Sequence, residues 1–167
     1  RVLFRSNPAK LNEAVFDVWA ATLRAAPDAT LLLHYKNSYA QPGLRDRVRG
    51  AFGRRDVDPA RITLDLNVRD MDSHLRLYHQ VDIALDTFPF SGSTTTFEAL
   101  WMGTPVVVLA GDSLMSRWGV SMMRDVGLDE LIAPDVGRYT ALAAGLAADR
   151  GRLTRLRAGM RERVAAS

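Results

Sequence analysis

Residues 81–109 read VDIALDTFPFSGSTTTFEALWMGTPVVVL, and their pattern is that of a strand, a loop, a helix and a second strand. The mostly apolar runs at 81–86 and 105–109 are typical of strands buried within a parallel sheet. Residues 95–102 indicate a helix, because apolar positions resume there with helical spacing after a loop rich in hydroxyl groups. A strand, a helix and a strand in this order predict a βαβ unit.

The same alternation of strands and helices continues on both sides of this unit. We expect further strands at 2–4, 30–35, 61–66 and 131–132. We expect further helices at 11–23, 44–52, 74–79, 116–126, 136–146 and 150–164. Residues 1–167 are therefore predicted to form one α/β domain, with a doubly wound, mostly parallel Rossmann-like sheet and helices on both faces.

Length and composition agree with a single folded domain. The chain has 167 residues, of which 47% are hydrophobic and 25% charged, which argues against wholesale disorder, collagen-like and coiled-coil architectures. It contains no Cys, so disulfides, thiolate metal sites and a cysteine nucleophile are excluded. No initiator Met is present and both ends resemble interrupted elements, so we expect a fragment of a longer chain.

Membrane and nucleic-acid partners are not expected. No apolar run approaches the roughly 18 residues of a membrane span, and the chain start lacks a secretory signal, so a cytoplasmic location is expected. Six arginines lie on the expected last helix: Arg150, Arg152, Arg155, Arg157, Arg161 and Arg163. A solvated helix face explains them better than a nucleic-acid surface, because an apolar stripe runs along the same helix.

The loop at 86–98 is the leading candidate for a ligand site. In an open parallel sheet, ligands bind beyond the carboxyl ends of the strands. This loop leads through Gly92 and the hydroxyl residues 93–96 into a helix, whose N-terminus favours an anion such as phosphate. The spacings of a dinucleotide fingerprint and of a P-loop are absent. The alternative is that Ser93 or Thr94 merely caps the helix.

Two further residues could meet a ligand at this edge. Glu98 follows Thr94 by about one helical turn, so its carboxylate could accept hydrogen bonds from ribose hydroxyls. It could equally be a surface residue that stabilises the helix N-terminus. After the Gly111-Asp112 turn, Ser116 and Arg117 could approach a ligand, although Arg117 could also be a plain surface residue.

Paired aspartates at positions 56 and 58 and at positions 70 and 72 have a spacing that would suit a metal clamp. Helix capping is the better interpretation, because Asp58 precedes Pro59 and Asp70 precedes an expected helix. The three histidines, His34, His74 and His79, show no metal-ligand spacing either. No metal site is expected.

Several motifs together are characteristic of one family. They are Leu85-Asp86-Thr87, Gly92-Ser93-Thr94-Thr95-Thr96, Glu98 to Val107, Ala110-Gly111-Asp112, Ser116-Arg117 and Leu131-Ile132-Ala133. In this combination the chain resembles the C-terminal catalytic lobe of the O-linked N-acetylglucosamine transferase and SPINDLY family. Lys10, Trp19 and the strand at 31–33 fall in family order upstream, so the resemblance covers essentially the whole chain.

The resemblance implies a function. Family members are inverting GT-B glycosyltransferases, usually with N-terminal tetratricopeptide repeats, and they move a sugar from a nucleoside diphosphate to protein Ser or Thr hydroxyls without a required metal or other cofactor. This chain would be the nucleotide-sugar-binding lobe, incomplete and inactive without the N-terminal catalytic lobe.

The resemblance also implies residue roles. Ser93, Thr94 and Thr95 would hold the diphosphate, Glu98 the ribose, and His74 would lie near the nucleobase. Lys10 would be catalytic, because a cation at the departing diphosphate stabilises the negative charge that develops there. From the residues alone, Lys10 could also be an ordinary solvated lysine.

One departure bears on the donor. Animal members have His, two Thr and Gly in the loop where this chain has Ser93 and Thr96 at the first and last positions. UDP-N-acetylglucosamine is the favoured donor, and GDP-fucose remains open. Two rival functions also remain open: a nucleotide-binding or sugar-phosphate-binding module without catalysis, and a nucleic-acid-binding domain that uses the arginines.

Overall fold

The computed structural model describes residues 2–5, 7–67 and 70–167. Its sheet has six strands in the order β3-β2-β1-β4-β5-β6, and all neighbouring pairs are parallel. The strands are β1 (Val2–Arg5), β2 (Thr30–His34), β3 (Ile62–Asp65), β4 (Ile83–Leu85), β5 (Val106–Leu109) and β6 (Ile132–Ala133). The chain moves outward from β1 to β3, returns to place β4 beside β1, and moves outward again, which confirms the doubly wound prediction.

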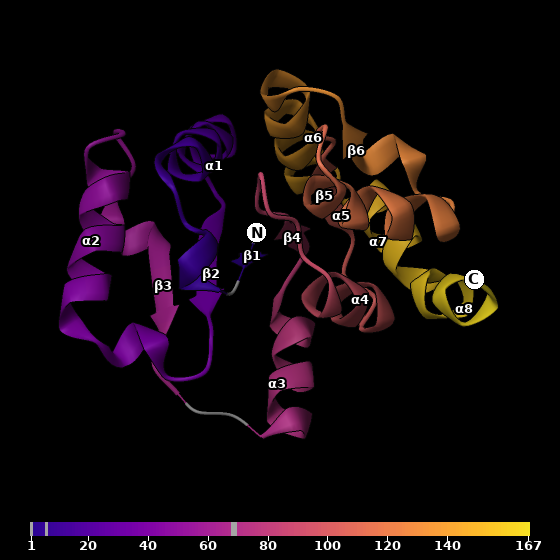
Figure 1. The fold of residues 1–167 in the computed structure, drawn as a ribbon, viewed down its shortest axis with the longest axis horizontal. Helices are drawn as coiled ribbons and strands as arrows, with labels where there is room; N and C mark the ends of the chain where they lie inside the picture. The colour runs from indigo at the N-terminus through magenta and orange to yellow at the C-terminus, as the bar shows by residue number, and fades with distance from the viewer. Residues whose placement is uncertain (1, 6, 68–69) are drawn as a thin grey trace.

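Eight α-helices connect and cover these strands in the described part of the chain (Figure 1). They are α1 (Glu13–Ala25), α2 (Pro42–Gly53), α3 (Met71–Leu77), α4 (Thr94–Trp101), α5 (Leu114–Asp125), α6 (Val136–Ala148), α7 (Arg150–Ala158) and α8 (Met160–Ala166). Short 3-10 turns are η1 (Pro8–Lys10), η2 (Ser38–Ala40), η3 (Pro59–Arg61), η4 (Tyr78–Gln80) and η5 (Asp129–Leu131). None of the described helices has both the length and the apolar character needed to span a bilayer.

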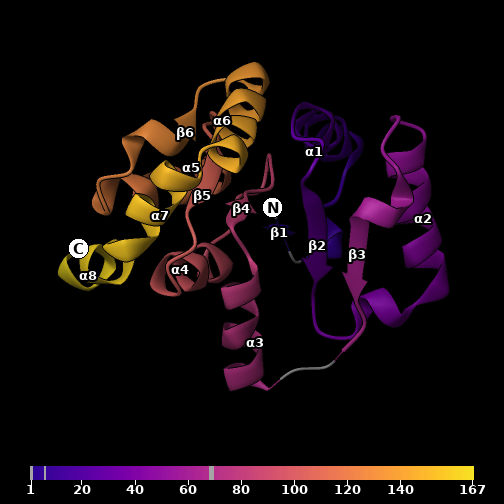
Figure 2. The ribbon, with the colours of Figure 1, turned by 180° about the vertical axis from the view of Figure 1, so that it is seen from behind.

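The core joins the two halves of the sheet. α1 and α6 lie side by side in both Figure 1 and Figure 2, although more than a hundred residues separate them. Trp19 of α1 and Tyr139 of α6 are fully buried, and the Trp19 indole Nε1 donates a hydrogen bond to the Tyr139 hydroxyl at 3.4 Å. Buried aromatic groups with a polar atom need such a partner, so this contact fixes how the two helices pack.

The prediction of a single helix over residues 150–164 is wrong in one respect, because the helix is interrupted. It ends at Ala158 and starts again at Met160, with Gly159 between α7 and α8. Glycine is a poor helix former, and the break lets α8 pack against α4. The apolar stripe is buried as expected, at Leu153, Leu156, Met160 and Val164.

The arginines of these helices do more than face solvent. Arg157 is partly buried, and its guanidinium donates a hydrogen bond to the Val81 carbonyl oxygen at 2.6 Å. The guanidinium of Arg161 lies over the Trp101 ring, 4.9 Å from its centre. These two arginines attach the C-terminal helices to the rest of the domain, whereas Arg150, Arg155 and Arg163 are exposed as predicted.

Candidate functional site

The loops that follow the strands gather at one edge of the sheet because all the strands are parallel. The arrows of β2 and β3 in Figure 1 point toward the end of the molecule where α3 and α4 lie. Three loops leave this edge: 7–12 after β1, 86–93 after β4 and 110–113 after β5. The predicted residues lie in the first two loops and on the helices α3, α4 and α5. β1 and β4 are neighbours, so the first two loops meet although they are far apart in sequence.

The loop after β4 presents its hydroxyl groups at the start of α4. Ser93 is the N-cap residue, but its side chain makes no capping hydrogen bond. Ser93 and Thr95 are partly exposed and Thr94 is exposed, so these hydroxyls are not packed away. Thr96 differs, because it is fully buried and its hydroxyl has no hydrogen-bond partner among the described residues. The first-turn N–H groups and three accessible hydroxyls form a surface suited to an anion.

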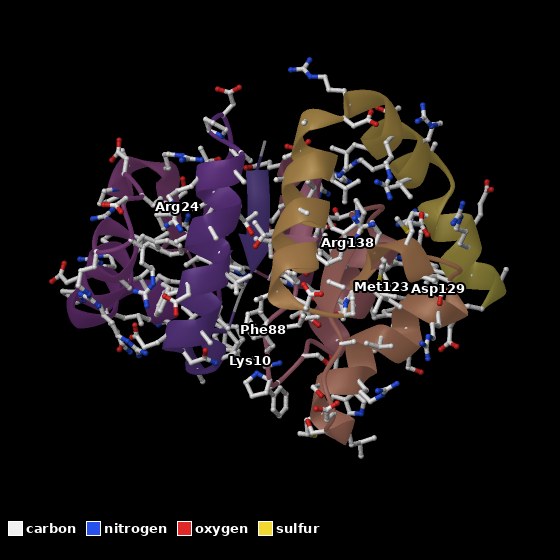
Figure 3. The ribbon with its side chains drawn as sticks, turned by 90° about the horizontal axis from the view of Figure 1, so that it is seen from above. Lys10, Arg24, Phe88, Met123, Asp129 and Arg138 are labelled. Carbon is white, nitrogen blue, oxygen red and sulfur yellow. The ribbon has the colours of Figure 1, made fainter. Side chains whose placement is uncertain are left out.

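Lys10 joins this loop from the other half of the domain. Its Nζ donates a hydrogen bond to the Ser91 carbonyl oxygen at 2.8 Å and lies 4.2 Å from the centre of the Phe90 ring. The next turn is also attached, because the Asn12 amide donates to the Phe88 carbonyl oxygen at 2.9 Å. Figure 3 shows Lys10 and Phe88 together, between α1 and α6, where both line a cavity of about 380 Å³. Lys10 is therefore not an ordinary solvated lysine.

Glu98 and His74 form a pair on the other side of the α4 N-terminus. His74 Nε2 lies 3.0 Å from Glu98 Oε2, and the two side chains are only 19% and 15% exposed. The interpretation of Glu98 as a plain surface residue is therefore wrong. Both residues line a cavity of about 240 Å³, together with His34, Tyr35, Lys36, Asp70, Met71 and Thr95.

The cavity also contains a second histidine that the sequence did not single out. His34, at the end of β2, is buried, and its Nδ1 lies 3.2 Å from Asp65 Oδ2 of β3. The rings of His34 and His74 are 5.4 Å apart between centres. Only the pairing of β2 with β3 places His34 beside Asp65, so the linear sequence carries no signal for the contact.

Sequence reasoning also missed the residues that hold the 86–93 loop in place. Asp86 is buried, and its Oδ1 accepts hydrogen bonds from the backbone N–H of Thr87 at 2.9 Å and of Gly92 at 2.7 Å. Ser91 is also buried, and its hydroxyl donates to the Met115 carbonyl oxygen and accepts from the Gly119 N–H. The sequence carries one signal for Asp86: it is a polar residue directly after a buried strand, in the loop that is the leading candidate for a ligand site.

Ser116 and Arg117, the other two candidates, are not shown to contribute to the surface at the start of α4. Ser116 is buried and forms a capping box with Ser113 at the start of α5, so its hydroxyl is engaged in the helix cap. Arg117 is exposed and makes one long contact, 3.4 Å, with the Gly111 carbonyl oxygen. Arg117 is thus a surface residue in this structure.

One aspartate of each pair serves as a helix cap. Asp58 Oδ1 accepts from the Ala60 N–H, and Asp70 Oδ1 accepts from the Ser73 N–H, both at 2.8 Å. Hydrogen bonds from the side chain and then the backbone of Ser73 lower the pKa of Asp70 below its ordinary value. Over 2–5, 7–67 and 70–167, no three His, Asp or Glu side chains converge as a metal-binding group.

The strand order and the parallel pairing define a Rossmann-like domain, a fold in which ligands bind beyond the carboxyl ends of the strands. The fold is that of GT-B enzymes: the solved OtsA apo structure matches with a TM-score of 0.59 over 99% of this chain and 39% of that chain, at 15% identity. Residues 5–167 match the model of glycosyl transferase family 41, and the chain belongs to this family.

Individual relatives agree with this assignment. The chain is 36% identical over 162 residues to a probable UDP-N-acetylglucosamine–peptide N-acetylglucosaminyltransferase SPINDLY of Oryza sativa. This match covers 97% of the present chain and 17% of the rice protein. A UDP-N-acetylglucosamine–peptide N-acetylglucosaminyltransferase of Caenorhabditis elegans is 32% identical over 149 residues, 89% of this chain and 12% of that one. A solved O-GlcNAc transferase mutant of Thermobaculum terrenum matches with a TM-score of 0.93 and 37% identity, over 99% of this chain and 32% of that one. The resemblance seen in the sequence is confirmed, and the chain spans about a sixth of the length of the rice relative.

Proposed function

We propose that this chain is the donor-binding half of a protein O-glycosyltransferase, which moves a sugar, N-acetylglucosamine in first place, from a nucleoside diphosphate to Ser or Thr hydroxyls. Two matched relatives carry names that state a UDP-N-acetylglucosamine–peptide activity. The observation that carries the proposal is the hydrogen bond from Lys10 to Ser91, because it places a cation at the loop that opens α4.

The proposed chemistry is displacement of the diphosphate from the sugar. The acceptor oxygen bonds to the anomeric carbon as the bond to the diphosphate breaks on the opposite face, which inverts the configuration. The departing phosphoryl oxygens gain negative charge, and Lys10, the N–H groups of the first α4 turn and the hydroxyls of Ser93, Thr94 and Thr95 are positioned to stabilise it. In this scheme no metal is required.

The rest of the nucleotide would extend away from Lys10 along the start of α4. Glu98 would accept hydrogen bonds from the ribose, and His74 would lie beside the base in the cavity of about 240 Å³. The two groups lie on the same side of the helix start as Thr95, which also lines that cavity. The sugar would then lie near the aromatic cavity beside Lys10.

The acceptor groove and the general base are proposed to belong to an N-terminal catalytic lobe, with tetratricopeptide repeats before it. The small share of each relative that this chain covers leaves room for both. Without them the lobe is expected to bind nucleotide but not to transfer sugar. A cytoplasmic setting remains part of the proposal.

Calorimetry tests the proposal directly. The intact protein is titrated with UDP, GDP, UDP-N-acetylglucosamine and GDP-fucose, and tight binding of the uridine pair is expected. Preference for the guanosine pair would overturn the donor assignment but not the fold of the site. Binding of none of the four, together with salt-sensitive binding of nucleic acid, would overturn the proposal itself.

A further inference from the structure

Two different side chains hold a single oxygen of Glu98. His74 Nε2 lies 3.0 Å from Oε2, and the hydroxyl of Tyr78 donates to the same Oε2 at 3.3 Å. No described residue makes a hydrogen bond to the second oxygen, Oε1. The carboxylate is therefore held from one side, while Glu98 itself lines the cavity of about 240 Å³.

Tyr78 is well placed to impose this orientation because it cannot easily move. It is fully buried, its ring packs edge-on against His74 with 5.7 Å between centres, and its hydroxyl also reaches the Thr95 carbonyl oxygen at 3.3 Å. Tyr78 follows His74 by four residues, so the end of α3 and the start of η4 bring both side chains to Glu98.

We propose that Tyr78 is a positioning residue that directs Glu98 Oε1 toward the ribose of the bound nucleotide. The inference rests on the proposed function, which places the ribose at Glu98. A carboxylate oxygen is an acceptor only, so it recognises a hydroxyl donor and gains nothing from a C–H at the same place. Tyr78 thereby sets the preference for ribose over 2′-deoxyribose without touching the ligand.

The test compares UDP with 2′-deoxy-UDP in calorimetry of the intact protein. The unaltered protein is expected to bind UDP about tenfold more tightly, as for a hydrogen bond to a charged group. Tyr78→Phe keeps the ring but removes the hydroxyl, and is expected to reduce this preference about threefold or more. Tyr139→Phe is the matched control, because it removes a buried tyrosine hydroxyl that binds the Asp86 carbonyl oxygen, and it should leave the preference unchanged.

The possible results separate this inference from the proposed function. An unaltered protein that binds neither nucleotide contradicts the proposed function. Binding of UDP with the same ribose preference in the unaltered protein and in Tyr78→Phe, or with no preference in either, overturns the role of Tyr78 alone. If Tyr78→Phe does not fold, Tyr78→Met tests the same point, because it also lacks the hydroxyl group that holds Glu98 while filling part of the volume of the ring. An unchanged preference in that variant also overturns the inference.

Discussion

The Nζ atom of Lys10 donates a hydrogen bond to the carbonyl oxygen of Ser91 at 2.8 Å, across 81 residues of sequence. The contact exists because β1 and β4 are neighbours in the sheet, so the loops that leave them share one edge. The Lys10 ammonium, which comes from the first half of the domain, thus lies at the 86–93 loop of the second half.

Replacement of Lys10 by Ala is expected to reduce sugar transfer by about a hundredfold or more, while UDP binding weakens much less, because in the proposed function the cation acts mainly on charge that develops as the diphosphate departs. The measurement is the rate of transfer in the intact protein beside calorimetry with UDP. Arg150→Ala is the control, since it removes one positive charge from an exposed position on α7. A transfer rate that stays within twofold would remove Lys10 from the catalytic role.

Replacement of Asp86 by Ala is expected to lower the free energy of unfolding by about 2–4 kcal/mol, because two buried backbone N–H groups lose their acceptor. The expected loss is smaller for Asp86→Asn, which retains an amide oxygen at the same place. Urea denaturation measures both. The Asp86→Asn protein should also bind UDP less tightly with little change for uridine, since the proposed function places the diphosphate at the 86–93 loop. An equal loss of affinity for both ligands would contradict this expectation.

Gly119 is expected to tolerate no side chain. A Cβ at this position would lie 2.7 Å from Asp86 Oδ2 and 3.1 Å from a methyl group of Val108, and both are buried. Gly119→Ala should therefore destabilise the domain by about 1–3 kcal/mol. Gly145→Ala on α6 is the matched control, because nothing lies within 4 Å of its Cβ and alanine favours the helix. Thermal unfolding should shift in opposite directions, and a shared direction would count against the close approach of α5 to Asp86.

The cap of α3 is expected to weaken in acid. The pKa of Asp70 is lowered in the folded protein, so its contribution to stability is fully present above the ordinary carboxyl value, about 3.9, and is lost as the pH falls through the folded-state pKa. Asp70→Ser keeps a capping oxygen but cannot titrate. The difference in unfolding free energy between Asp70→Ser and the unaltered protein should therefore change only below about pH 4, and a change centred near pH 6 would point to another group.

Much of the fold was predictable because buried parallel strands and amphipathic helices leave clear patterns. The segments 30–34 and 106–109 are nearly continuous apolar runs, and the loop between β4 and α4 stands out by its hydroxyl groups. The break at Gly159 was not predicted, because the apolar stripe continues through it and only packing against α4 requires the turn.

The candidate site was predictable only in part. Lys10, Glu98, His74 and the hydroxyl loop were found, partly from family resemblance, and the structure brings them to one edge; their roles remain predictions. The supporting groups were out of reach, because Tyr78 matters through its distance to Glu98 and Asp86 through the backbone N–H of Gly92. Neither relationship has a spacing rule. Thr96 was not assigned to the site, and the structure buries it, although the four hydroxyls of this run look equivalent in the sequence.

The packing of α1 against α6 joins the N-terminal and C-terminal halves of the domain at a second place, in addition to the contact of Lys10 with the 86–93 loop. The two halves are consequently held together twice, once in the core by α1 and α6 and once at the carboxyl edge of the sheet by Lys10. A nucleotide bound across that edge would connect the two halves at a third place. Amide hydrogens in β1 and β4 should therefore exchange with solvent at similar rates, and both rates should fall as ligand is added.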